Sequence, residues 1–129
     1  MARIVDTAQG PRGTPAGPFP YSQAVVAGGL VFVSGQGPWD ASGVIVGETI
    51  EEQTRQALTN VRAILDAAGS SIERVVNVTF VLANAEDFSG FNAEWAHWFP
   101  ANPPARSGAK HPAPAPGLRI SIAAIAEAG

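Results

Sequence analysis

The chain has 129 residues, of which 46% are apolar and only 15% charged, with a formal net charge of −3. This length predicts one domain over residues 1–129 with a real hydrophobic core. The 8 basic residues form no basic stripe, which argues against RNA or DNA as the main ligand.

The residue types also restrict the kind of site. The chain has no cysteine, which excludes disulfides, thiolate zinc sites and a cysteine nucleophile. Two scattered histidines, His97 and His111, are too few for a convincing metal site, and we expect no cofactor. No apolar run approaches transmembrane length and the first residues lack a signal-peptide core, so we expect a cytoplasmic protein without a membrane partner.

The first third of the chain is rich in turn residues. Residues 9–20 carry so many glycines and prolines that we expect a loop there. Residues 23–34 are typical of two short strands around a turn at Gly28-Gly29. Residues 35–48 read as another loop, with a short strand over 44–46.

A helix is predicted from Thr49 onwards. Thr49 and Glu52 form a capping box. Apolar residues then recur at helical spacing up to Ala68, and Gly69 supplies the stop.

The second half predicts a strand, a helix and two further extended segments. Residues 75–82 form the strand, and Asn84 caps a helix that Pro100 ends. Residues 105–111 and 118–126 are extended. In the strand over residues 75–82, the residues expected to share the core face are Val76, Val78, Phe80 and Leu82. The aromatic stripe of the helix, assigned to core packing, is Phe88, Phe91, Trp95 and Trp98.

This element order predicts a two-layer α+β domain in which both helices cover one face of a sheet. The opposite face would carry small and mildly polar residues. Packing against another subunit would explain its character, as would the low proportion of charged residues. The residues concerned are Asn77, Thr79, Ser121 and Ala123.

Arg106 lies in an unusual setting. It follows Pro103-Pro104-Ala105, a stiff lead-in, and an arginine held on a short rigid segment can bind a carboxylate through two parallel hydrogen bonds. A solvated surface arginine is the alternative on position alone.

Four segments together identify a family resemblance: Pro20–Ala24, Ser34–Pro38, Phe91-Asn92 and Pro104–Ser107. With these segments in order and similarly spaced, the chain resembles the Rid (YjgF/YER057c/UK114) family of reactive-intermediate deaminases, which also carries an older endoribonuclease label. The resemblance runs from about Pro18 to Ala126.

The resemblance implies a chorismate-mutase-like α+β fold with one mixed sheet, and a homotrimer with ligand clefts between subunits. It implies hydrolysis of enamines and imines such as 2-aminoacrylate to 2-oxo acids and ammonia. Arg106 would hold the substrate carboxylate and Tyr21 would line the cleft. The backbone of Ser34 and Gly35 would contact the ligand, and Asn92 would shape the site.

Two departures from the family keep other functions open. Deaminases of this family commonly have Glu where this chain has Ser121. A serine can hydrogen-bond a water but is no general base at neutral pH. Two functions therefore stay open. One is catalysis by Arg106, Tyr21 and Ser121, and the other is a binding module for small carboxylates that has lost turnover.

The second departure is Gly108, where the family often has a larger residue. It suggests a roomier cleft and a pathway-specific hydrolase or lyase on a larger substrate. His111 is expected to point away from Arg106 in a straight strand and to be a surface histidine, so the sequence offers no clear replacement base.

Overall fold

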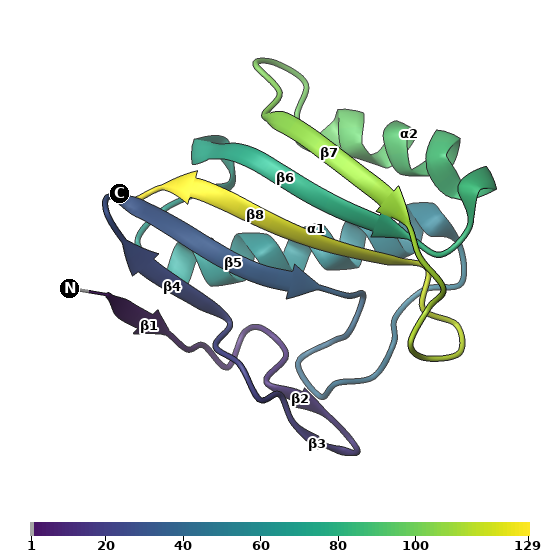
Figure 1. The fold of residues 1–129 in the computed structure, drawn as a ribbon, viewed down its shortest axis with the longest axis horizontal. Helices are drawn as coiled ribbons and strands as arrows, with labels where there is room; N and C mark the ends of the chain where they lie inside the picture. The colour runs from purple at the N-terminus through teal and green to yellow at the C-terminus, as the bar shows by residue number, and fades with distance from the viewer. Residues whose placement is uncertain (1) are drawn as a thin grey trace.

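The computed structural model describes residues 2–129 (Figure 1). The two helices and the longer strands follow one another in the predicted order, with two short 3-10 helices, η1 and η2, before β6 and α2. The bounds are β1 Arg3–Val5, β2 Gly13–Thr14, β3 Gly17–Pro18, β4 Ala24–Ala27, β5 Leu30–Gln36, α1 Ile50–Ala67, η1 Ile72–Arg74, β6 Val75–Leu82, η2 Ala85–Asp87, α2 Phe88–Trp98, β7 Ala105–Lys110 and β8 Ile120–Glu127.

Six of the strands form one mixed sheet in the order β1-β4-β5-β8-β6-β7. Only the β6–β7 pairing is parallel, and the other pairings are antiparallel. Both helices lie behind this sheet in Figure 1, which confirms the predicted α+β architecture. Strands β2 and β3 form a separate two-residue ribbon inside the segment that we expected to be loop.

Local signals set the ends of the best-predicted elements. Helix α1 begins with the predicted capping box, in which the Thr49 side chain accepts from the Glu52 backbone N–H and the Glu52 carboxylate accepts from the Thr49 N–H. Between β4 and β5, Gly28 and Gly29 both have positive φ, at 59° and 78°. Two consecutive left-handed residues make the tight hairpin turn that glycine favours.

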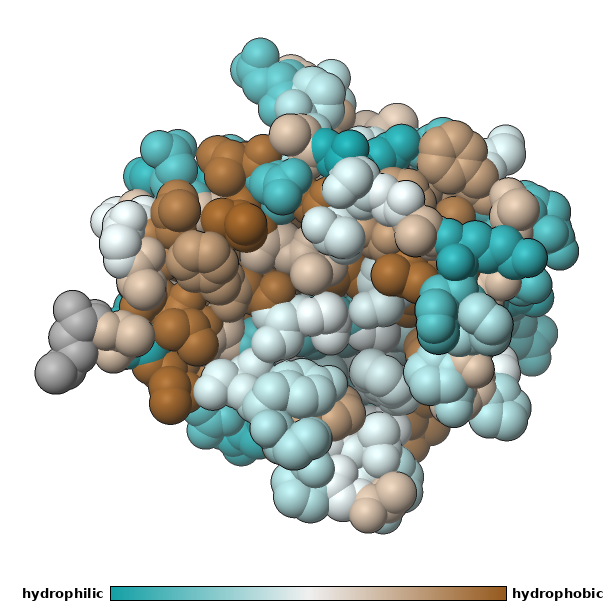
Figure 2. Space-filling view, viewed as in Figure 1, coloured by the Kyte–Doolittle hydropathy of each residue, from teal (hydrophilic) through white to brown (hydrophobic). Residues whose placement is uncertain are grey.

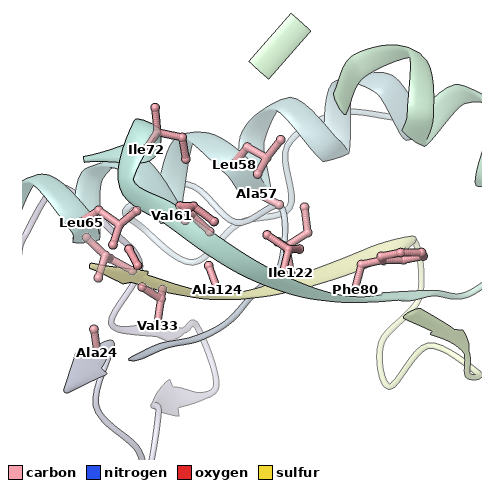
Figure 3. Close-up of a cluster of buried hydrophobic side chains, with 14 of the residues drawn as sticks. Ala24, Val33, Ala57, Leu58, Val61, Leu65, Ile72, Phe80, Ile122 and Ala124 are labelled. Carbon is pink, nitrogen blue, oxygen red and sulfur yellow. The ribbon is translucent and has the colours of Figure 1, made fainter. Parts of the chain in front are cut away.

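The core lies between α1 and the helix-facing residues of β5, β6 and β8 (Figure 3). Arg55 and Glu94 join the two helices by an ion pair of 3.0 Å. Trp98 Nε1 also donates to the buried Glu94 carboxylate at 3.0 Å. A second polar anchor is buried Gln53, whose side chain bonds three backbone groups outside the helix.

The opposite side of the sheet, which we call the open face, carries no helix. One row across it is apolar, because Ile4 lies opposite Val25, Val25 opposite Phe32 and Phe32 opposite Ile125. Ile4 is 67% exposed and Phe32 43% exposed. Figure 2 looks onto this face and shows hydrophobic residues gathered over β1, β4 and β5, beside a paler middle.

Two local predictions were wrong. Val76 is 42% exposed rather than in the core, because the β6–β8 register shifts between Val75 and Asn77 and takes Val76 out of the alternation. Asn84 precedes the 3-10 helix η2 rather than α2, and its side chain makes no capping hydrogen bond. Among residues 2–129, no helix is both long enough and apolar enough to span a bilayer.

Candidate functional site

Arg106 points toward the helix layer. It lies opposite Val78 on β6, which is itself buried under the helices. Its guanidinium carbon lies 4.8 to 5.6 Å from the centres of four aromatic rings, where a cation is attracted to the ring faces. These rings are Phe80, Phe88, Phe91 and Trp95.

The aromatic surroundings hold the guanidinium without neutralising it. Within residues 2–129, Arg106 has no ion pair with a carboxylate, whereas Arg55 pairs with Glu94 and Arg119 with Asp87. Burial lowers the pKa of Arg106, but an arginine stays charged at neutral pH. The site therefore offers a half-buried, oriented cation to an anion.

Asn92 and a groove lie beside the aromatic rings that surround Arg106. Asn92 is half-buried, and helical spacing places it on the side of α2 that also carries Phe88 and Trp95. The groove has a volume of about 340 Å³ and lies next along β7. It is lined by Phe80, Leu82, Ala85, Phe88, Gly108, Ala109 and Lys110. We call Arg106, Asn92 and the four rings the arginine half.

Gly108 does not make this groove roomier in the way that the sequence suggested. A Cβ built at Gly108 would lie 2.2 to 2.5 Å from three carbons of the Phe80 ring. The ring already fills the space that a side chain at position 108 would occupy. Gly108 is therefore needed for the close approach of Phe80, which in turn contacts Arg106.

Tyr21, Ser34, Gly35 and Ser121 form a second cluster, which we call the tyrosine half. The Ser34 hydroxyl donates to the Ser22 carbonyl oxygen at 2.7 Å, which ties the segment of Tyr21 to β5. The Tyr21 ring stacks on Phe19 at 5.1 Å and is 49% exposed. Partial burial raises the pKa of Tyr21, so its hydroxyl stays a proton donor at neutral pH.

Gly35 and Ser121 are immediate neighbours in this cluster. The β5–β8 register shifts between Val33 and Gln36, so Gly35 lies in an irregular stretch of the strand. A Cβ at Gly35 would lie 2.9 Å from the Ser121 hydroxyl oxygen. The glycine therefore leaves the space in which the Ser121 hydroxyl lies.

Ser121 also lines a small cavity of about 60 Å³. The lining comes from the ends of β6 and β8 and from the proline-rich segment between β7 and β8. It consists of Val81, Ala83, His111, Pro112, Ala113, Pro114, Leu118, Arg119, Ile120 and Ser121.

The two halves lie on opposite sides of the sheet in one chain. Ser121 alternates with buried Ile120 and Ile122, so its side chain points to the open face, whereas Arg106 points to the helices. One chain thus places Arg106 and Ser121 on different faces of the sheet. The roles predicted for the six residues stay predictions. In the described chain, no group of three or more His, Cys, Asp or Glu side chains is placed to hold a metal.

The sequence reading missed the aromatic surroundings of Arg106. It assigned the stripe on α2 wholly to core packing, and Phe91 and Trp95 are indeed buried. Phe88, however, is exposed at 45% and faces the guanidinium with the others. No sequence signal separates Phe88 from the core residues of the stripe, because its exposure depends on how α2 packs.

Comparisons with known proteins agree with this architecture. The family model described as "Endoribonuclease L-PSP" matches residues 13–128. A 2-iminobutanoate/2-iminopropanoate deaminase of Capra hircus is 41% identical over all of this chain and 92% of its own length. A RutC family protein of Pyrococcus horikoshii is 43% identical over 82% of each chain.

A solved structure shares the fold over nearly its whole length. The crystal structure of E. coli TdcF with bound serine superposes with a TM-score of 0.87 at 31% identity, covering 98% of this chain and 99% of that one. The match of the family model over most of the chain, together with relatives above 40% identity, agrees with the motifs around Arg106 and with the fold. The chain therefore belongs to the Rid (YjgF/YER057c/UK114) family.

Proposed function

We propose that this protein hydrolyses short-lived 2-imino acids and their enamine tautomers to 2-oxo acids and ammonia. The observation that carries this proposal is the Arg106 guanidinium, held among four rings and without a carboxylate partner in residues 2–129. A carboxylate can accept two parallel hydrogen bonds from it. The deaminase names of relatives near 40% identity support the same chemistry.

We further propose that a complete site forms between two copies of the chain in a homotrimer. The arginine half of one copy would face the tyrosine half of another, because the two halves lie on opposite sides of the sheet in one chain. The apolar row on the open face supports association, since an exposed row of this kind commonly marks an interface.

In such a site the substrate is held at both ends. Arg106 binds the carboxylate, and the rings around it restrict the approach. Tyr21 presents its hydroxyl proton to the imine nitrogen or to a water. Gly35 has no Cβ, so a ligand can approach its backbone closely. Holding an already electrophilic imine carbon beside a positioned water supplies much of the acceleration. The serine bound to TdcF carries the same carboxylate and nitrogen on one carbon.

A second candidate function is binding of small carboxylates without turnover. The feature that favours it is Ser121, whose hydroxyl is no general base at neutral pH. This candidate shares the carboxylate anchor with the first, so binding alone does not separate the two. The rate of imine decay does.

The test generates 2-aminoacrylate in situ and follows its decay with and without the protein. We expect acceleration over buffer that falls by about 10²-fold in Arg106→Ala, since a charge-assisted hydrogen bond contributes roughly 1.5–3 kcal/mol. Arg12→Ala is the matched control, because Arg12 is an exposed arginine paired with Asp6. Full activity in Arg106→Ala, or no acceleration with several small imino acids, refutes the proposal. Arg106-dependent binding of 2-oxobutanoate without acceleration identifies the binding module.

A further inference from the structure

The cavity beside Ser121 is suited to hold water. Its volume of about 60 Å³ is several times the roughly 10–15 Å³ that a cavity needs to hold one water. Ser121 and His111 both line it, and each has a side chain that can hydrogen-bond a water. It also adjoins the tyrosine half, because the Ser121 hydroxyl is the neighbour of Gly35.

His111 belongs to the same side of the sheet as Ser121. Strand β7 ends at Lys110, but the pairing continues one step further, since the His111 N–H donates to the Leu82 carbonyl oxygen at 3.0 Å. Alternation then places His111 on the open face, opposite to Arg106. On sequence alone, His111 is not expected to act as the base, because it points away from Arg106. In a site built from two copies, His111 belongs with Ser121.

One hydrogen bond orients the His111 ring for proton transfer. Nδ1 of His111 lies 2.9 Å from the Pro112 carbonyl oxygen. A carbonyl oxygen can only accept, so Nδ1 carries the proton and donates. The other ring nitrogen, Nε2, then holds a lone pair, and this is the tautomer that a general base requires.

The other lining residues leave no competing base. Among the described residues around the cavity there is no carboxylate, and the ionisable side chains are those of His111 and Arg119. The Arg119 guanidinium has no acceptor site for a proton, and it pairs with Asp87 at 3.1 Å. His111 is therefore the residue of this lining whose side chain offers a basic nitrogen, Nε2.

We propose that His111 is the general base of the hydrolysis, acting on a water held between its ring and the Ser121 hydroxyl. This inference rests on the proposed deaminase function. The imine reacts as its iminium ion, whose extra proton comes from solvent. In the first step the water oxygen bonds to the iminium carbon, the C=N π pair becomes a lone pair on nitrogen, and Nε2 takes the proton that the water loses. Nε2 then returns that proton to the carbinolamine nitrogen. The C–N bond breaks, and the hydroxyl proton leaves with ammonia as ammonium.

The first experiment compares His111→Ala with His97→Ala, which removes the other histidine of the chain and one that is also exposed. We expect kcat for in situ 2-aminoacrylate to fall by about 10²-fold or more in His111→Ala. KM and the Kd for 2-oxobutanoate should stay within about threefold, because Arg106 binds the carboxylate; retained binding also shows that the variant is folded. Added imidazole should restore part of the lost kcat. His97→Ala should be unaffected.

The second experiment supplies a base from the other side of the cavity. In Ser121→Glu the new carboxylate can take the water proton, so adding His111→Ala should cost less than about fivefold, against 10²-fold in the parent. An unchanged kcat in His111→Ala, with Arg106→Ala still inactive, overturns the role of His111 and leaves the deaminase proposal intact. An equal loss from His111→Ala in both backgrounds also overturns it. No acceleration by the unmodified protein overturns both proposals.

Discussion

Replacing Gly108 by alanine should destabilise the protein, although alanine is the better strand residue. The added Cβ would lie 2.2, 2.3 and 2.5 Å from three Phe80 ring carbons, where carbon atoms ordinarily stay about 3.5–4.0 Å apart. The Phe80 ring would have to move by more than about 1 Å. Its centroid lies 4.6 Å from that of the Phe91 ring, however, and Phe91 is fully buried. Overpacking of this kind costs about 1–3 kcal/mol. The gain from replacing glycine in a strand is about 0.5–1 kcal/mol, so the net effect is a loss.

A double-mutant cycle with Phe80→Leu isolates the cause. Leucine at position 80 has no ring that would contact the added Cβ. Gly108→Ala should therefore become neutral or mildly stabilising in the Phe80→Leu background. Urea unfolding followed by tryptophan fluorescence, at one fixed protomer concentration, measures both free-energy differences. The Phe80 ring also lies 5.1 Å from the Arg106 guanidinium carbon, so kcat/KM should fall in Gly108→Ala. A loss below about 0.5 kcal/mol, or the same loss in both backgrounds, would refute the steric argument.

Three further predictions concern the anchors of the helices. Gln53→Leu keeps the side-chain volume but leaves the carbonyls of Gly47 and Gly117 and the Arg119 N–H without their partner, and should lower the free energy of unfolding by about 2–4 kcal/mol in urea titrations. Thr49→Ala removes the capping hydrogen bond of α1 and should cost about 1 kcal/mol in the same assay, with no change in m. Burial alone would raise the pKa of Glu94, but hydrogen bonds from its helix partners outweigh burial and hold that pKa below its usual value. Because the folded-state pKa is the lower one, Glu94 stabilises the fold above its unfolded pKa and loses this effect as the pH falls. Unfolding midpoints should therefore drop more steeply between about pH 5 and pH 3 in the parent than in Glu94→Gln, and identical slopes would contradict the assignment.

Predictions from sequence succeeded where a local pattern carries its own physical cause. The capping box of Thr49 and Glu52 needs only four consecutive residues, and the Gly28-Gly29 turn needs only two residues that tolerate positive φ. Both were confirmed. The face of Val76 was wrong because a bulge depends on pairing with β8, some fifty residues away in the chain. Strict alternation along one strand cannot reveal it.

The same distinction between local patterns and long-range pairing applies to the candidate site. The family, the α+β architecture and the identity of the residues to consider could be predicted from the amino-acid sequence, because motifs such as Pro104–Ser107 are contiguous. How these residues are grouped in space depends on the three-dimensional fold. It placed four rings around Arg106, it filled the space beside Gly108 with the Phe80 ring, and it put Ser121 on the open face. These relations depend on strand register and on packing between elements distant in the chain, which no spacing along the sequence specifies.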